Sequence, residues 1–267
     1  MNYSQYSKKT QKIVDELRII DDALFRLVAE DKEVCQEILQ TLLDKPELRV
    51  LKVTAQSLVQ SINREVVLDA LCETDKGILC NIEMQKGNSN NDVFRTRFHA
   101  SAITSKYTPK GVDFENLPKV TILYITEYDA LKNGQTVTHV SRCMKNGNEY
   151  IPVNDGEDIV FANTVINDGS NKAELLQLML NKDTFYNEKF PAMSNAIKYF
   201  KESEGGRSRM CKSVEDYAQE VAKEAAKEAA KETRTLMLKD FLANGGSEED
   251  AIRMLGASEE EIKSAKE

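Results

Sequence analysis

The chain has 267 residues, of which 41% are hydrophobic and 30% are charged, so it can form one large domain or a domain with an appendage. Its net charge of −8 argues against a protein that coats nucleic acid non-specifically, and no apolar run reaches the roughly 18 residues of a membrane span. The first residues, MNYSQYSKKTQK, lack the apolar core of a signal peptide, so we expect a cytoplasmic protein with no membrane partner.

The N-terminal part predicts two helices followed by a strand. Apolar residues recur at helical spacing between Leu17 and Leu43, and Asp31 is the expected start of the second helix. The sequence Asp-Lys-Pro at residues 44–46 ends this helix, and residues 50–62 predict a first strand.

Residues 64–85 predict a β-hairpin. Two arms rich in β-branched and apolar residues flank the turn sequence Asp75-Lys76-Gly77. A three-residue hairpin loop commonly ends in a glycine with left-handed backbone geometry, which is the place of Gly77. Such a loop pairs Thr74 with Ile78 and thereby fixes the register of the whole hairpin.

This register brings two acids and an amide together. Asp69 stands opposite Glu83, with Cβ atoms roughly 5 Å apart, and Gln85 shares their face because side chains alternate along a strand. Two carboxylates this close repel each other unless a proton or a cation lies between them. A hard divalent cation such as Mg²⁺ prefers oxygen ligands. The alternative is an ordinary solvated sheet edge, against which the apolar neighbours Leu71 and Leu79 argue.

The few cysteines and histidines exclude several kinds of site. None of the five cysteines forms a Cys-x-x-Cys motif, and the odd count argues against a disulfide scaffold. Cys72 and Cys80 would face each other across the hairpin, where buried thiols are favoured over a bond in a reducing compartment. With only His99 and His139 present, a histidine-rich zinc site is nearly excluded.

The segments after the hairpin complete an α/β core. Residues 93–107 predict an amphipathic helix, and residues 119–128 form an apolar, β-branched run that predicts a buried strand. Further strands are expected within residues 136–143 and 159–163. The order of helix, hairpin, helix and strand predicts an α/β sandwich around a mixed sheet.

Beyond residue 170 the pattern is helical. Residues 173–180 and 192–201 predict helices, and the glycine pair in residues 204–209 indicates a hinge before a long helix over residues 214–242. The alanines of this long helix are too small for a strong coiled-coil seam, so a spacer arm is favoured over an oligomerisation helix. The second alternative, a homo-oligomer formed through this helix, stays open. Residues 247–267 predict a terminal helical hairpin.

Six short motifs occur along the chain in a fixed order. They are Asp22-Ala-Leu-Phe-Arg26, Val67-Leu-Asp69, Asn81-Ile-Glu83-Met-Gln85, Arg95-Thr-Arg97-Phe-His99, Lys110-Gly-Val-Asp113 and Arg253-Met-Leu-Gly256. This ordered set resembles the PD-(D/E)XK nuclease family transposases of the recombination-promoting nuclease group, which is widespread in bacteria. The resemblance implies a restriction-endonuclease-like αβββαβ core with a mixed sheet in residues 1–203. Residues 204–267 would form a helical extension.

The resemblance also implies an active site. The family pattern D…(D/E)-x-K falls on Asp69, Glu83 and Gln85. The two acids would bind Mg²⁺, or Mn²⁺ in its place, and the metal would activate a water molecule for hydrolysis of a phosphodiester. An acid from the first helices often completes such a site, and Glu37 is the candidate for this third metal ligand.

Gln85 departs from the family pattern. A lysine at this position supplies positive charge near the attacking water, which an amide cannot do. Glutamine can still orient water by hydrogen bonding, and this would leave electrostatic stabilisation to the metal and to nearby arginines. Arg95 and Arg97 lie where the family often has a basic helix that holds DNA phosphates, the alternative being an ordinary exposed helix face. Lys86 points to the opposite face by strand alternation.

Two functions from different classes remain. The first is a Mg²⁺-dependent DNA endonuclease that promotes recombination or is associated with mobile elements. The second is a catalytically weakened module of the same fold that binds DNA or a partner through the Arg95–Arg97 helix and the C-terminal arm.

Overall fold

The computed structural model describes residues 2–60, 65–87 and 90–266. The predicted ends of the first strand and of the first hairpin arm, at Ile62 and Arg64, lie outside these residues. The chain divides into two compact units, Met1–Val214 and Glu215–Glu267, which are described separately.

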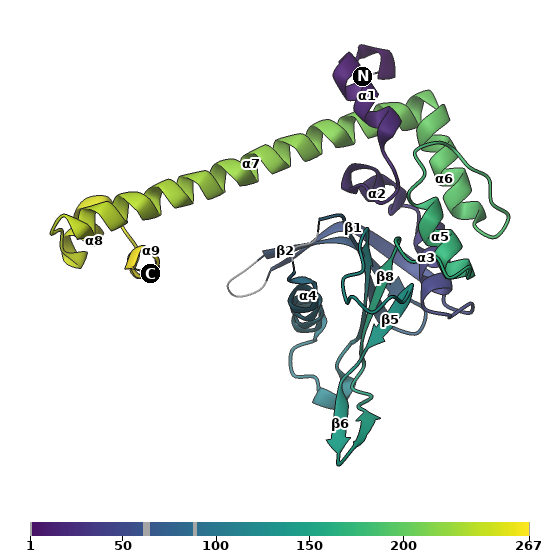
Figure 1. The fold of residues 1–267 in the computed structure, drawn as a ribbon, viewed down its shortest axis with the longest axis horizontal. Coiled ribbons are helices and arrows are strands. Elements are labelled where there is room, and N and C mark those ends of the chain that lie inside the picture. Colours follow the sequence, from purple (N-terminus) through teal and green to yellow (C-terminus); the bar gives the residue numbers. More distant parts are fainter. Residues whose placement is uncertain (1, 61–64, 88–89, 267) are drawn as a thin grey trace. The chain divides into compact units, whose positions relative to one another are not determined.

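The first unit is built on a mixed sheet, which contains six strands within the described residues (Figure 1). In spatial order the strands are β1 (Val50–Gln60), β2 (Glu65–Thr74), β3 (Ile78–Gln85), β4 (Lys119–Thr126), β8 (Glu157–Asn163) and β5 (Val137–Val140). Strands β1, β2 and β3 are antiparallel, β3, β4 and β8 are parallel, and β5 runs antiparallel to β8. The mixed sheet predicted from the sequence is confirmed.

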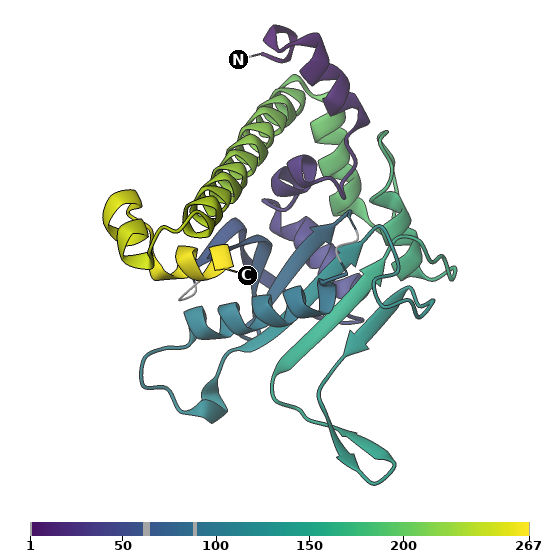
Figure 2. The same cartoon turned by 60° about the vertical axis from the view of Figure 1, so that its left-hand side comes forward.

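Helix α4 (Asp92–Tyr107) connects β3 to β4. Parallel neighbours need a crossover connection, and α4 provides it. The helix lies lengthwise across one face of the sheet and packs against β1, β2, β4 and β8 (Figure 2). Its position completes the predicted αβββαβ order.

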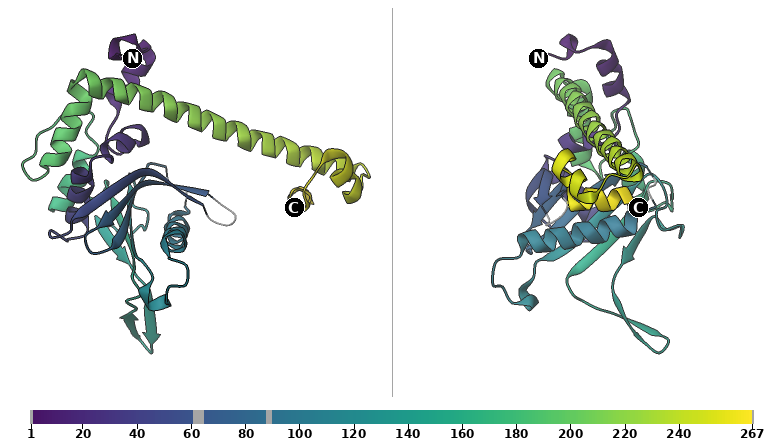
Figure 3. Two further views of the ribbon diagram at one scale, coloured as in Figure 1. Left: turned by 180° about the vertical axis from the view of Figure 1, so that it is seen from behind. Right: turned by 90° about the vertical axis from the view of Figure 1, so that its left-hand side faces the viewer.

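The other helices of this unit cover the opposite face. Helices α2 (Asp22–Val28) and α3 (Lys32–Leu42) pack against β1 and β2. Helices α5 (Asn171–Leu178) and α6 (Pro191–Glu202) pack beside α3 (Figure 3). Covered on both faces, β4 is buried from Val120 to Thr126, as its continuous apolar run predicts. Helix α1 (Lys8–Glu16) and the short 3₁₀ turns η1 (Tyr3–Gln5) and η2 (Phe114–Asn116) complete the helical elements of the unit.

The hairpin between β2 and β3 has the predicted register. Ala70 pairs with Ile82 and Cys72 pairs with Cys80, the pairs that a three-residue turn requires. Gly77 has a φ of 69°, in the left-handed region. The two cysteines are free and buried, and burial raises the pKa of the Cys80 thiol to about 11, so both side chains pack as small apolar groups.

The glycine pair predicted to form a hinge instead begins helix α7 (Glu204–Ala243). The chain bends one residue earlier, at Ser203, whose hydroxyl accepts a hydrogen bond from the Gly206 N–H at 2.9 Å. A Cβ atom on Gly206 would lie 2.2 Å from the carbonyl oxygen of Tyr199. The glycine therefore permits close packing of α7 on the end of α6, and the prediction of a hinge was wrong.

The segment predicted as one strand over residues 136–143 contains two shorter elements. Strand β5 ends at Val140, and β6 (Cys143–Asn146) pairs with β7 (Glu149–Pro152) in a separate two-stranded sheet. All eight residues of this ribbon are exposed. A strand with no buried face has no need of alternating apolar residues, which are the signal that predicts a strand from sequence.

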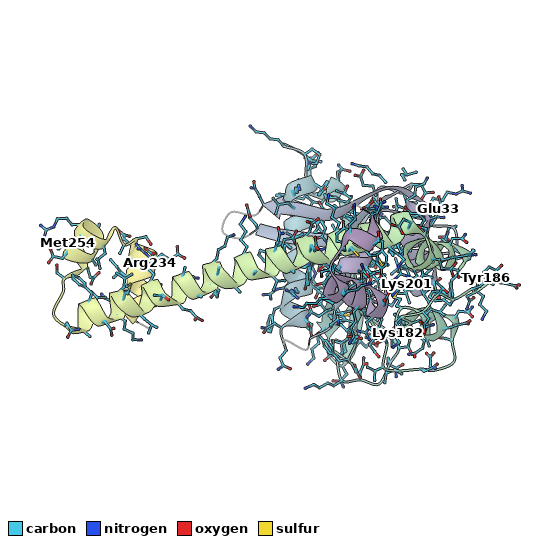
Figure 4. The ribbon with its side chains drawn as sticks, turned by 90° about the horizontal axis from the view of Figure 1, so that it is seen from above. Glu33, Lys182, Tyr186, Lys201, Arg234 and Met254 are labelled. Atoms are coloured by element: carbon cyan, nitrogen blue, oxygen red, sulfur yellow. The ribbon has the colours of Figure 1, made fainter. Side chains whose placement is uncertain are left out.

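The second unit is helical. The end of α7 packs against α8 (Glu248–Leu255) and α9 (Glu259–Lys266) around a small core that includes Leu238, Ala251 and Ile262. Arg234 donates hydrogen bonds to the carbonyl oxygens of Leu255 and Gly256, which end α8 (Figure 4). None of the helices in the described part of the chain is both long and apolar enough to cross a membrane.

The turn that sets the hairpin register is testable at Gly77. A Cβ atom there meets no other atom within 4 Å, so a side chain adds only backbone strain. Gly77→Ala is expected to lower the free energy of unfolding by about 1 kcal/mol, the cost of a left-handed alanine. Gly77→Asn is expected to cost less, because asparagine tolerates this geometry. Urea unfolding of both variants measures the difference, and equal losses would contradict the assignment.

Candidate active site

An open cavity of about 870 Å³ lies between the β2–β3 hairpin and the first turns of α4. Asp69 lines it from β2, Glu83 and Gln85 line it from β3, and Arg95 and Arg97 line it from α4. Five of the six candidate residues from the sequence therefore meet at one cavity. Glu37 is not among the residues that line it.

At the open end of the hairpin, the two carboxylates accept hydrogen bonds from backbone N–H groups in place of the backbone carbonyls of a regular strand pair. The paired register of β2 and β3 reaches Ala70 and Ile82 and ends there. Beyond it, the Met84 N–H donates to Oδ2 of Asp69 at 2.9 Å, and the Asp69 N–H donates to Oε1 of Glu83 at 3.3 Å. Each carboxylate thus accepts a backbone hydrogen bond from the opposite strand, and these bonds hold the two side chains close together.

The charge of this pair is not balanced by its own hydrogen bonds. Burial and the negative charge of Glu83 raise the pKa of Asp69 well above its usual range, while the Met84 N–H acts in the opposite direction. The pair therefore retains a proton more strongly than two separate acids, and it favours a cation that can replace that proton.

Two residues without a predicted role lie against Glu83, and one of them is hydrogen-bonded to it. Asn81, fully buried two residues earlier on β3, donates its Nδ2–H to Oε1 of Glu83 at 2.7 Å. Nδ1 of His99 on α4 lies 3.5 Å from the same oxygen. Strand alternation places Asn81 on the face of Glu83, so its spacing was a usable signal. The approach of His99 depends on how α4 packs, and spacing alone does not reveal it.

The Gln85 amide is held at both ends. Its Nε2–H donates to the carbonyl oxygen of Gly87 at 2.7 Å, and its Oε1 accepts a hydrogen bond from Nη1 of Arg95. Arg97 is exposed, with its guanidinium carbon 5.7 Å from the ring centroid of Phe94. Both arginines are exposed, but Arg95 is bound to the strand that carries the acids, whereas Arg97 lies near the Phe94 ring.

The structure places Glu37 at the N-terminus of α6 and not among the residues that line the cavity. Its carboxylate accepts hydrogen bonds from the backbone N–H groups of Ala192 and Met193, at 3.0 and 2.9 Å, in the first turn of α6. Burial raises the pKa of Glu37, and these two N–H groups oppose the shift. The acid from the N-terminal helices that lines the cavity is Asp22, whose negative charge contributes to the raised pKa of Asp69.

Lys86 is held outside the cavity. Its Nζ lies 2.5 Å from Oδ1 of Asp21, a buried acid that also binds Arg18. The lysine next in sequence to Gln85 is therefore committed to an ion pair on the other side of β3.

The donor set fits a weakly coordinated hard cation. Across the described residues, no group of three or more His, Cys, Asp and Glu side chains is arranged to hold a metal ion. Asp69 and Glu83 nevertheless present carboxylate oxygens, and their repulsion is the observation that favours a divalent cation. Mg²⁺ usually keeps several water ligands and binds one or two carboxylates together with substrate phosphates, so two acids are sufficient.

Comparison with known proteins relates the chain, by its sequence, to a described family. Residues 21–240 match the family model described as PD-(D/E)XK nuclease family transposase. The match covers the whole sheet, α4 and most of α7. Searches of curated proteins and of solved structures found no match to the chain.

The repulsion between the acids is testable without metal. Because the folded state raises the pKa of Asp69, it holds a proton that the unfolded chain has already lost, so stability falls as pH rises from the usual aspartate range through the raised value. Glu83→Gln removes one charge but keeps an oxygen acceptor for Asn81. We expect the variant to be more stable than wild type by about 1 kcal/mol at pH 8 in EDTA, with a smaller gain at pH 5.

Urea unfolding at the two pH values measures this gain. Glu73→Gln is the matched control, because Glu73 lies on β2 but pairs with Lys52 at the surface. Lower stability of Glu83→Gln at pH 8 would contradict a repulsive pair.

The role of Glu37 is testable by its removal. Phe190, the cap residue of α6, offers no side-chain hydrogen bond, so Glu37 satisfies N–H groups that would otherwise lack an acceptor. Glu37→Ala is expected to lower the free energy of unfolding by about 1 to 2 kcal/mol. Glu33→Ala, at an exposed position of the same helix (Figure 4), is expected to change it by less than about 0.5 kcal/mol. Loss of a Mg²⁺-induced thermal shift in Glu37→Ala would instead return this residue to the metal site.

Proposed function

Because the chain belongs to the PD-(D/E)XK nuclease family transposases, we propose that it is a Mg²⁺-dependent DNA endonuclease. The observation that carries the proposal is the pair formed by Asp69 and Glu83, two carboxylates held together at the wall of an open cavity that arginines also line. We further propose that the ends produced by cleavage promote recombination or serve a mobile element.

In this proposal Asp69 and Glu83 hold the cation. Asn81 fixes the orientation of the Glu83 carboxylate, and the backbone N–H of Met84 fixes that of Asp69. When bound, a divalent cation polarises the scissile phosphate and lowers the pKa of a water ligand. Mn²⁺, which also accepts oxygen ligands, is expected to replace Mg²⁺.

Arg95 and Arg97 bind the DNA backbone in this proposal. Guanidinium groups match phosphate oxygens with paired N–H donors. Both residues line the cavity from α4, and Arg95 also reaches Gln85 on β3. Attack by water on phosphorus breaks one phosphorus–oxygen bond of the DNA backbone and leaves a phosphate monoester on one end and a hydroxyl group on the other.

One observation favours a second function. Gln85 occupies the position at which the family pattern has lysine, and the nearby Lys86 is bound to Asp21. A site without its own lysine agrees with a catalytically weakened module that binds DNA or a partner. Cleavage separates the two functions directly.

Supercoiled plasmid DNA provides the test. With Mg²⁺ the wild-type protein is expected to nick or linearise the plasmid, and Asp69→Ala is expected to reduce the rate by at least about 1,000-fold and to abolish the Mg²⁺-induced thermal shift. Glu73→Ala, from the surface ion pair on the same strand, is the matched control and should cut like wild type. A wild-type protein that binds DNA but cuts none with Mg²⁺ or Mn²⁺ would favour the binding module.

A further inference from the structure

The guanidinium of Arg95 is hydrogen-bonded to a neutral amide, and a buried phenol lies beside that amide. Its Nη1–H donates to Oε1 of Gln85. The orientation of that amide is fixed, because the Nε2 end of Gln85 donates to the Gly87 carbonyl. The phenol oxygen of Tyr124, on β4, lies 3.4 Å from the same Oε1. The phenol thus lies against the amide oxygen that accepts from the arginine.

Tyr124 is a rigid support for this contact. Its ring is fully buried and packs edge-on against Phe161, with ring centroids 5.6 Å apart. Its hydroxyl donates to Oδ1 of Asp92 at 3.0 Å. Burial raises the pKa of Tyr124, and the neighbouring Asp92 adds to the shift against the opposing effect of Arg95, so the phenol stays neutral. The neutral phenol donates to Asp92 and lies against the amide oxygen that accepts from the arginine.

The network closes on α4. Asp92 is the first residue of α4, and Arg95 lies one turn further along the same helix. Asp92 is buried and also accepts a hydrogen bond from the hydroxyl of Tyr128 at 2.9 Å. The helix is therefore attached to β4 beside the point at which its arginine reaches β3, which limits the positions open to the guanidinium.

Arg95 is electrostatically coupled to the acid pair. Burial acts to lower its pKa, but the interactions with Tyr124 and with the negative charges of Glu83 and Asp69 outweigh this effect and raise it. The arginine therefore stays charged beside the two carboxylates. A lysine at position 85 would place a second cation against this guanidinium, whereas the glutamine oxygen accepts from it.

Building on the proposed nuclease activity, we propose that Gln85 and Tyr124 position Arg95 so that its guanidinium supplies the positive charge at the scissile phosphate that lysine supplies in the family pattern. Arg95 is the group that touches the phosphate. Gln85 and Tyr124 act through it as positioning residues. The glutamine is then a feature of an active enzyme whose cation comes from the crossover helix.

Relocating the charge tests the proposal. Arg95→Gln is expected to lower kcat about 100-fold, as loss of one preorganised donor does. Adding Gln85→Lys to that variant is expected to raise kcat at least tenfold above that of Arg95→Gln, because a lysine on β3 again supplies positive charge to the site. Gln85→Lys alone is expected to lower activity, because its ammonium group repels Arg95. Arg97→Gln is the matched control, and Gln85→Lys is expected to give it no recovery.

The positioning role has its own pair of variants. Tyr124→Phe keeps the ring packing but removes the hydroxyl, and we expect kcat to fall about tenfold with little change in KM. Tyr128→Phe removes the other phenol bound to Asp92 and is expected to leave kcat within about twofold of wild type. A loss that appears equally in both variants would assign the effect to Asp92 and the packing of α4.

A measurement without metal or DNA keeps the arrangement itself testable. In ¹⁵N NMR spectra of the metal-free protein, the Arg95 guanidinium is expected to show slow rotation and separate Nη signals, assigned by their loss in Arg95→Gln. Tyr124→Phe should restore fast averaging, and Tyr128→Phe should not. Fast averaging in wild type would overturn the proposal.

The outcomes separate the two proposals. Wild-type protein that cuts DNA, with no recovery when Gln85→Lys is added to Arg95→Gln, would overturn the role of Arg95 and leave the nuclease intact. Wild-type protein that cuts nothing would overturn the nuclease and the catalytic role of Arg95 together.

Discussion

The repulsion between two carboxylates at the end of a buried hairpin is the constraint on which the site depends. Asp69 and Glu83 each accept a backbone N–H from the opposite strand, so neither can turn away without losing that bond. Burial strengthens the repulsion and raises the pKa of Asp69. The contacts around the pair make sense as responses to this cost. Asn81 donates a hydrogen bond to the pair, and Arg95 brings positive charge close to it.

The topology of the sheet determines which elements can respond. Strand β3 lies between the antiparallel β2 and the parallel β4, so the chain must cross over one face between β3 and β4. That crossover is α4, and its first turns line the cavity beside Glu83 and Gln85. The acidic residues of the hairpin and the arginines of α4 therefore meet because α4 directly follows β3 in the chain and crosses the sheet beside it.

The sequence predicts the parts of this site that depend on local rules. A glycine-closed turn sets the register of the hairpin, and strand alternation then places Asp69, Glu83 and Gln85 on one face. Contacts between helices follow no comparable rule. Glu37 and Asp22 are both acids near the start of the chain, and only the packing of α6 on α3 shows that Glu37 binds the α6 N-terminus while Asp22 lines the cavity. The sequence predicts a flexible hinge at the glycines in the first turn of α7 for the same reason, because their close packing against α6 is visible only in three dimensions.

Moving the cation from a strand to a helix changes what the site depends on. A lysine at position 85 would be positioned by the hairpin alone, two residues after Glu83 on the same strand. Arg95 is placed by three elements, because Gln85 lies on β3, Tyr124 on β4 and Asp92 at the start of α4. Its charge is then available only when the crossover helix is docked on the sheet. In the proposed nuclease, positive charge at the scissile phosphate therefore depends on the docking of α4 on the sheet, and the Gln85 amide is the acceptor that holds Arg95 in place.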